Sequence, residues 1–357
     1  MSSEQYEAPL PAPLPGPVEA SPAAAAAQGS HWRPRGASLA GLLASAVLLA
    51  VLYRSLDFRL IVATLVRADK VWLVVSVFLI LPITVLRAIR FYWVAPAGAL
   101  PSLGEALRLT LVSSALNVFI PAKAGDLVKS YFIATRSHTS AGVAVSVVLY
   151  ERLCDLVGLI TWCMLGYAVA RPQVPGLPQI FWPLLGLFGC GCIVLIASNR
   201  AATSLLTIAT GLLPKRAPRQ LRTLASGWPE LVATLRGRRV WAVLFSLALW
   251  LAHLFQIWLF TVTLSARIPF TVCASLATVA LMAGQLPFTL AGLGARDVAL
   301  VLLLSRYMPR ESAAALGILI ATRNVLPPLC GLPLMGPYLS TIVEEARRWR
   351  SAAGQSA

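Results

Sequence analysis

Charged residues are scarce in this sequence of 357 residues. They make up 12% of the chain, whereas soluble domains carry about 25%. Hydrophobic residues account for 58%, and the mean hydropathy is +0.75. These values exclude an ordinary soluble enzyme and are typical of a polytopic membrane protein that folds as one helical bundle.

Histidine is nearly absent, and the cysteines are not arranged as metal ligands. The chain has three histidines and six cysteines, and each cysteine lies in or beside an apolar segment without C-x-x-C spacing. We therefore expect packing cysteines, with no disulfide and no metal site. The sequence also lacks a Walker motif and a nucleophile with its base, and Gly292-Leu293-Gly294 follows no predicted strand. No cofactor is expected, and an enzyme is the less favoured class.

Acidic residues are fewer than basic ones, 14 against 30, which gives a formal net charge of +16. The bases lie in short loops between apolar segments and do not form a basic domain. We therefore expect no nucleic-acid partner. The anionic headgroups of membrane lipids are the expected partner instead.

The ends of the chain differ from its middle. Residues 1–29 contain no base, a proline-rich run over 9–17 and an alanine run over 23–27. This composition predicts a disordered tail over 1–30, and it lacks the basic start of a signal peptide. One transmembrane domain is predicted over 31–340, followed by a C-terminal tail over 341–357.

Several apolar segments are long enough to cross a bilayer, which takes about 17 residues or more. Two further pairs of apolar segments are shorter, and we predict that each pair forms a re-entrant hairpin. The alternative is that each pair is two full spans. The six predicted spans are 37–53, 71–94, 142–170, 180–197, 240–264 and 312–334, and the hairpins are 106–120 with 127–134 and 272–286 with 298–304.

The two hairpin breaks resemble each other. Each combines proline and glycine with a base and a carboxylate, and in each half an arginine follows the carboxylate after 26 residues. The match predicts an internal duplication, with pseudo-repeats over about 71–170 and 240–335. The helix-breaking residues are Pro121 and Gly125 in the first half and Pro287, Gly292 and Gly294 in the second; the spaced pairs are Asp126 with Arg152 and Asp297 with Arg323.

The basic residues also predict an orientation. Segment 199–239 carries eight bases against one acid, Glu230, so the positive-inside rule makes it a cytoplasmic loop. Counting spans from this loop places both termini in the cytoplasm. The two hairpins then enter from opposite sides, as an inverted repeat. The bases between 54 and 70 fall outside and argue against this orientation.

Charges inside hydrocarbon are costly, so they mark functional candidates. Cations can bind the phosphate of a lipid headgroup, with arginine offering two donors, and carboxylates can pair with them when no lipid is bound. Lys129, Arg136 and Arg306 fit snorkelling instead. The candidate cations are Lys123, Arg152, Arg296 and Arg323, and the candidate acids are Asp126, Glu151, Asp155 and Asp297.

Uncharged polar residues near these positions admit two interpretations. Asn117, Gln285 and Asn324 either line the cavity or bond across helices, and His253 with Gln256 fits interhelical bonding better than a proton relay. The apolar series Leu221, Leu224, Trp228, Leu231 and Leu235 predicts a surface helix that anchors the basic loop on anionic lipid.

From about Arg87 to Gly331 the sequence resembles the flippase-like transmembrane domain of lysylphosphatidylglycerol synthases and its stand-alone relatives. The resemblance rests on 117–126, on 151–155, on 286–297 and on Arg323. Where the family usually has Arg and Glu, this chain has Lys123 and Asp126, and it has Asp297 in place of Glu. In members with synthase activity an aminoacyl-transferase domain follows, and because this chain ends at Ala357, the resemblance implies lipid translocation without aminoacylation.

The sequence thus favours an integral membrane lipid translocase in the cell membrane, moving a phospholipid or another anionic or polyprenyl-type lipid between leaflets. Two alternatives stay open, both in lipid, hopanoid or glycan biosynthesis. A membrane-embedded transferase would use Glu151 and Asp155 as acid and base. An accessory subunit would partner a separate lipid-modifying enzyme, and its intramembrane charges would tolerate substitution.

Overall fold

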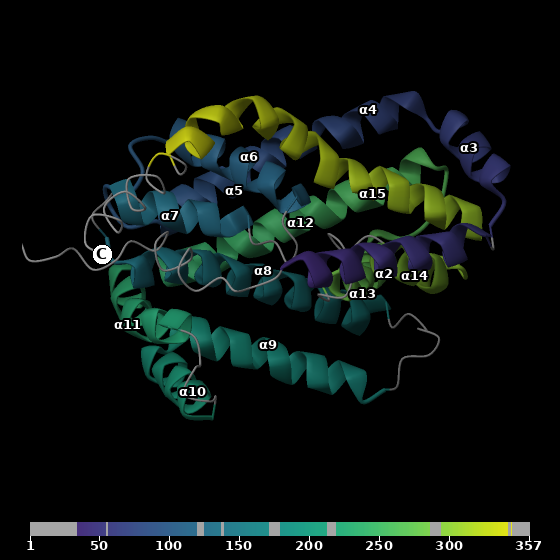
Figure 1. Cartoon of the computed structure of the whole chain (residues 1–357). Coiled ribbons are helices and arrows are strands. Elements are labelled where there is room, and N and C mark those ends of the chain that lie inside the picture. The colour runs from purple at the N-terminus through teal and green to yellow at the C-terminus, as the bar shows by residue number, and fades with distance from the viewer. Residues whose placement is uncertain are drawn as a thin grey trace, which may run out of the picture.

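The computed structural model describes residues 34–54, 56–119, 125–136, 139–170, 179–212, 219–285, 294–341 and 344, and these residues form helices and no strand (Figure 1). Long apolar runs fold this way because hydrocarbon offers the backbone no other hydrogen-bond partners. The helices are α2 (Pro34–Arg54), α3 (Phe58–Val66), α4 (Lys70–Phe78), α5 (Ile80–Val94), α6 (Leu103–Phe119), α7 (Leu127–Arg136), α8 (Ala141–Ala170), α9 (Phe181–Ala197), α10 (Asn199–Leu212), α11 (Arg219–Thr234), α12 (Arg239–Thr263), α13 (Phe270–Ala283), α14 (Ala295–Leu304), α15 (Arg310–Gly331) and the 3-10 helix η3 (Leu332–Leu334).

Helices α3 and α4 begin at side-chain caps. Asp57 accepts a hydrogen bond from the backbone N–H of Arg59 at 2.8 Å, and Asp69 accepts one from Val71 at 2.9 Å. Such caps satisfy backbone donors that a helix start leaves free. The two acids between the first two apolar segments therefore fix where these helices begin.

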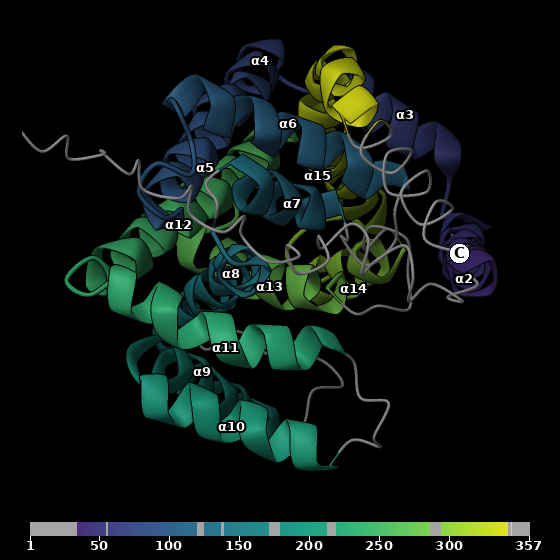
Figure 2. The same ribbon diagram turned by 60° about the vertical axis from the view of Figure 1, so that its left-hand side comes forward.

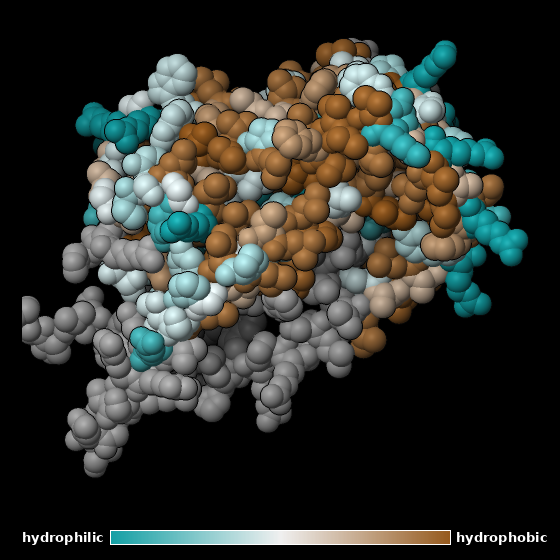
Figure 3. All heavy atoms as spheres, turned by 90° about the horizontal axis from the view of Figure 1, so that it is seen from above, coloured by the Kyte–Doolittle hydropathy of each residue, from teal (hydrophilic) through white to brown (hydrophobic). Residues whose placement is uncertain are grey.

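Three helical units among the described residues are long and apolar enough to cross a bilayer: α4 with α5, α12, and α15 continued to Thr341. Helix α9 and α10 as far as Ile208 pass the same criterion only together, and the chain turns by 109° between them. Seen from above, hydrophobic side chains cover the middle of the molecule and hydrophilic ones gather toward its two ends (Figure 3). The described part of the chain is thus all-helical, with units apolar enough to cross a membrane, while the count of six spans stays a prediction.

The first hairpin arm of each predicted repeat packs on the last helix of the other repeat. Helix α13, the first arm of the second predicted hairpin, packs along α8, and α6, the first arm of the first hairpin, packs along α15. Within each half the arms pack on their own last helix as well, α7 on α8 and α14 on α15 (Figures 1 and 2). Corresponding helices therefore make corresponding contacts.

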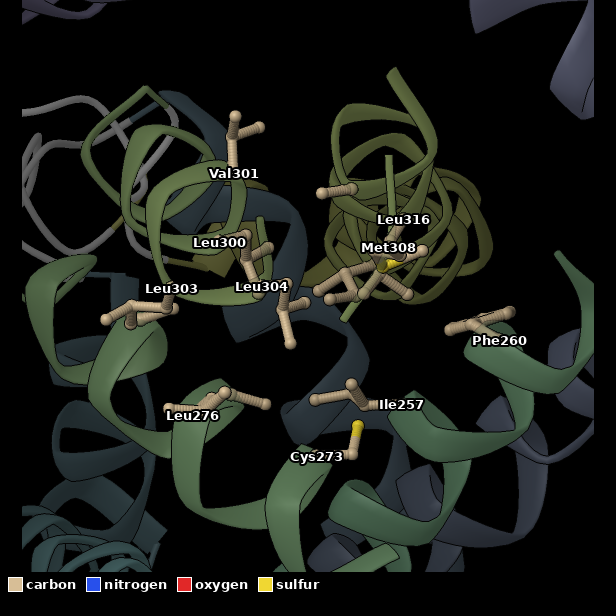
Figure 4. Close-up of a cluster of buried hydrophobic side chains, with 14 of the residues drawn as sticks. Ile257, Phe260, Cys273, Leu276, Leu300, Val301, Leu303, Leu304, Met308 and Leu316 are labelled. Carbon is tan, nitrogen blue, oxygen red and sulfur yellow. The ribbon is translucent and has the colours of Figure 1, made fainter. Parts of the chain in front are cut away.

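The buried side chains form two hydrophobic clusters. One is centred on α12, α13, α14 and α15, where Ile257, Cys273, Leu276 and Leu304 face a shared interior (Figure 4). The other joins α6, α7, α8 and α11. Helices α8, α9 and α12 contribute buried side chains to both clusters and so connect them.

Helix α11 corrects the prediction of a surface helix on lipid. Its Trp228, Leu231 and Leu235 are buried, and the helix packs on α8 beneath the bundle (Figure 2). The ring of Trp228 lies 6.0 Å from that of Tyr150 between centroids. The amphipathic pattern was right, but its apolar face covers protein. Segment 199–239 is accordingly two helices, α10 and α11, joined through residues that lie outside those described.

The crossing of α11 over α8 depends on Gly227. A Cβ atom at this position would overlap the backbone of Gly142 on α8. We expect Gly227→Ala to lower the free energy of unfolding in detergent by about 1–3 kcal/mol, as overpacking does in other cores. The matched control is Gly191→Ala on α9, whose Cβ would meet nothing within 4 Å. A Gly227→Ala protein that melts at the wild-type temperature would show that the crossing is not tight.

Candidate functional site

A cavity of about 170 Å³ lies between α5, α8, α12, α13, α14 and α15. Polar and charged residues make up more than half of its lining, among them the exposed Gln285 and Asn324. A concave site with convergent polar groups is a candidate binding site. The charged residues of the lining are four arginines and one carboxylate: Arg87, Arg152, Arg296, Arg323 and Asp155.

Arg90, on α5, joins three helices behind this cavity. Its guanidinium lies 2.6 Å from Asp155 and 3.5 Å from Glu151, both on α8, and donates to the Ser246 hydroxyl on α12 at 3.1 Å. Glu151 also lies 3.3 Å from the ammonium of Lys129 on α7. The Arg90 side chain is only 3% exposed, so these partners stabilise a charge that is fully removed from water.

Asp126 and Arg152, the first pair that the 26-residue spacing singled out, are in direct contact. Asp126 follows the break between α6 and α7, and it also accepts hydrogen bonds from the Ser113 hydroxyl and, at 3.1 Å, from the Asn117 amide. Arg152 has a second carboxylate, Asp155, at 3.8 Å, and its side chain is 32% exposed. Each member of the pair therefore keeps other partners if the contact opens.

Gly125 allows the break to approach α6 closely. A Cβ atom there would lie 2.7 Å from the backbone nitrogen of Asn117, so no larger residue fits. The short approach places Asp126 beside the donors of α6. Gly125 is thus the structural reason that the carboxylate reaches its partners.

The second half is arranged differently. Asp297 pairs with its neighbour Arg296, whose Nε and Nη2 donate at 3.0 and 2.7 Å, and it caps α14 by accepting from the N–H of Gly294 at 3.2 Å. Arg296 also donates to the Gly317 carbonyl of α15 at 3.1 Å. Both side chains are more than nine-tenths buried. Gly294 has φ +90, a conformation that other residues rarely adopt. The Arg296–Asp297 pair is therefore buried and fixed, whereas Asp126 pairs with an arginine that is partly exposed.

Arg323 does not pair with Asp297 in the described part of the chain. Its Nη2 lies 2.5 Å from Nδ1 of His253 on α12, so His253 accepts from it as a neutral imidazole. The cavity lining also contains groups without a partner among the described residues: Nη1 of Arg323, Nε1 of Trp250 and Oε1 of Gln256. Two of these groups, Nη1 of Arg323 and Nε1 of Trp250, are hydrogen-bond donors, and neither has an acceptor among the described residues.

The structure brings most of the sequence-predicted residues together. Arg152, Asp155, Arg296 and Arg323 line the cavity, while Glu151, Asp126 and Asp297 hold the cations from behind. The remaining candidates, Lys123, Pro121, Pro287 and Gly292, lie outside the described residues. Gly125 and Gly294 stand where the helices after each break begin.

Sequence reasoning misjudged or missed several residues. Lys129 was expected to snorkel, but it is buried against Glu151 and over the ring of Phe91 because α8 covers it. Arg87 and Arg90 were missed, although two charges three residues apart inside an apolar span are themselves a signal. His253 was assigned to interhelical bonding, and its contact with Arg323 is such a bond, at the cavity wall.

The described residues contain no group of three or more His, Cys, Asp or Glu side chains that could hold a metal ion. Glu151 and Asp155, the acid and base of the transferase alternative, are both engaged by Arg90. The cavity therefore presents four arginines and one carboxylate, Asp155, to a ligand.

A family model for the lysylphosphatidylglycerol synthase TM region matches residues 38–330. The matched range includes every helix that lines the cavity. No curated protein matches the chain.

Proposed function

The chain belongs to the lysylphosphatidylglycerol synthase TM-region family, and from that premise we propose that it is a lipid translocase. It moves an anionic lipid, a phospholipid or one of polyprenyl type, between the leaflets of the cell membrane. The headgroup passes through the arginine-lined cavity while the tails stay in hydrocarbon.

One observation carries this proposal, the contact between Asp126 and the partly exposed Arg152 at a cavity with an excess of arginine. An anionic headgroup competes with Asp126 for the guanidinium, since arginine binds phosphate with two parallel donors. Ser113 and Asn117 still hold Asp126 when Arg152 leaves, so exchange leaves no orphan carboxylate. Because Arg152 exchanges Asp126 for the headgroup and back again, the headgroup can enter and leave the cavity without being bound too tightly.

We further propose that the two halves are an inverted repeat with both termini in the cytoplasm. The reciprocal packing of α6 on α15 and of α13 on α8 supports it, because a pseudo-two-fold axis generates such contacts in pairs. An inverted repeat gives two similar conformations that open to opposite leaflets. The fixed Arg296–Asp297 pair then acts as the stationary half of the site.

Reconstitution of the full chain into liposomes with a fluorescent anionic phospholipid tests the proposal. The wild-type protein should accelerate leaflet exchange over empty liposomes. Arg152→Gln should slow exchange by about tenfold, the loss expected from one charge-assisted hydrogen-bonded contact. Arg59→Gln on exposed α3 is the matched control and should leave the rate unchanged. Undiminished exchange by a correctly inserted Arg152→Gln protein would disprove the proposal.

A further inference from the structure

The charges around the cavity do not cancel. Four of the six nearby cations are matched by the four nearby carboxylates, in pairs that the structure shows in contact. The other two cations have no carboxylate within 4.0 Å in the described part of the chain. The matched cations are Arg90, Lys129, Arg152 and Arg296, the carboxylates are Asp126, Glu151, Asp155 and Asp297, and the unmatched cations are Arg87 and Arg323.

The two unmatched arginines both line the cavity, Arg87 from α5 and Arg323 from α15. They come from different predicted repeats and face the same space. Arg87 and Arg323 share this space with Arg152 and Arg296, so four positive charges line it against one carboxylate, Asp155. Both arginines are partly buried, and a partly buried charge gains from pairing, so an anionic ligand in the cavity supplies the missing partner.

Unpartnered donors stand at the same place. Nη1 of Arg323 and Nε1 of Trp250 are buried on the cavity wall without an acceptor among the described residues. Arg87, also on the wall, makes no hydrogen bond through its side chain with any described residue. Three donor groups from α5, α12 and α15 therefore surround one small space. A group with several anionic oxygens satisfies them together.

We infer that the cargo headgroup ends in a phosphate with two negative charges, a monoester or a diphosphate, rather than in a phosphodiester. The inference rests on the proposed translocation and names the class of its cargo. A phosphate monoester carries a charge of about −1.5 to −2 at neutral pH and three acceptor oxygens, which matches two guanidinium groups and an indole N–H. A phosphodiester carries one charge and leaves one guanidinium unmatched.

Competition among lipids tests the inference. The full chain is reconstituted into phosphatidylcholine vesicles that contain trace labelled phosphatidate, phosphatidylglycerol or phosphatidylcholine, and the exchange rate of each is measured. Phosphatidate should exchange at least about tenfold faster than phosphatidylglycerol, since one further charge-assisted contact favours binding by about that factor. Uptake of radioactive inorganic phosphate by the same vesicles separates a lipid cargo from a soluble one.

Variants of Arg87 show whether the second charge causes the preference. Arg87→Gln should lose most of the preference for phosphatidate, and Arg87→Lys should keep much of it because the charge remains. Arg59→Gln is the control for a lost surface charge. Equal exchange of phosphatidate and phosphatidylglycerol by the wild type overturns the inference and leaves translocation standing. Exchange of no lipid overturns both, and phosphate uptake without lipid movement overturns the lipid as the cargo.

Discussion

Arg90→Met should lower the free energy of unfolding by about 3–5 kcal/mol, because it removes the nearest cation of Asp155 and one of the two cations of the buried Glu151. Arg90 contacts Asp155, Glu151 and Ser246, and through them it joins α5 to α8 and α12. Met keeps the length of the aliphatic stem but lacks the guanidinium group, so the loss combines the missing charge with a buried void. Unfolding in a detergent titration measures the change.

Two companion variants separate the buried charge from other effects. Adding Asp155→Asn to Arg90→Met should restore part of the stability, since it removes the nearer unpaired carboxylate while Lys129 still pairs with Glu151. Arg108→Met, at an exposed arginine 3.9 Å from Glu105, should cost about 0–1 kcal/mol. If Arg90→Met were no less stable than Arg108→Met, the network behind the cavity would not hold the three helices together.

Arg323→Gln should reduce leaflet exchange of an anionic lipid by about ten- to one hundred-fold while the protein still folds and inserts. Arg323 is half-buried at the cavity, and one of its nitrogens has no acceptor among the described residues. Its contact with neutral His253 contributes less to stability than an ion pair does. Function is therefore expected to fall far more than stability.

Arg323→Lys distinguishes charge from geometry. Lysine keeps the charge but offers no planar pair of donors, so exchange should recover in part. Gel filtration and thermal unfolding of both variants show whether folding is intact. A lipid exchange rate for Arg323→Gln equal to that of Arg59→Gln would exclude Arg323 from the path.

Much of the helix layout follows from the sequence because the length of an apolar run sets the length of its helix. The predicted spans 71–94 and 142–170 correspond closely to α4 with α5 and to α8. The predicted hairpin arms likewise coincide with α6, α7, α13 and α14. Proline and glycine together indicated the breaks, whereas proline alone does not end a helix here, since Pro229 lies inside α11 and Pro327 and Pro328 lie inside α15.

The partners of the charges were harder to predict, because they depend on packing between distant segments. Arg90 and Asp155 are 65 residues apart in sequence, and nothing local connects them. The 26-residue spacing found the Asp126–Arg152 contact, but in the second half Arg296 lies nearer to Asp297 and takes the corresponding place. An amphipathic series like that of α11 has the same pattern whether lipid or protein covers it.

The most direct measurement is the effect of a bulky group placed in the cavity. Asn324 is exposed on the cavity lining, and Cys190 and Cys330 are the exposed native thiols. In the background Cys190→Ala, Cys330→Ala, the variant Asn324→Cys is labelled with a membrane-impermeant thiol-reactive sulfonate, and leaflet exchange is measured before and after. We expect labelling to stop lipid exchange and added anionic lipid to slow the labelling. Fully labelled protein that exchanges lipid at the unlabelled rate would contradict a path through this cavity.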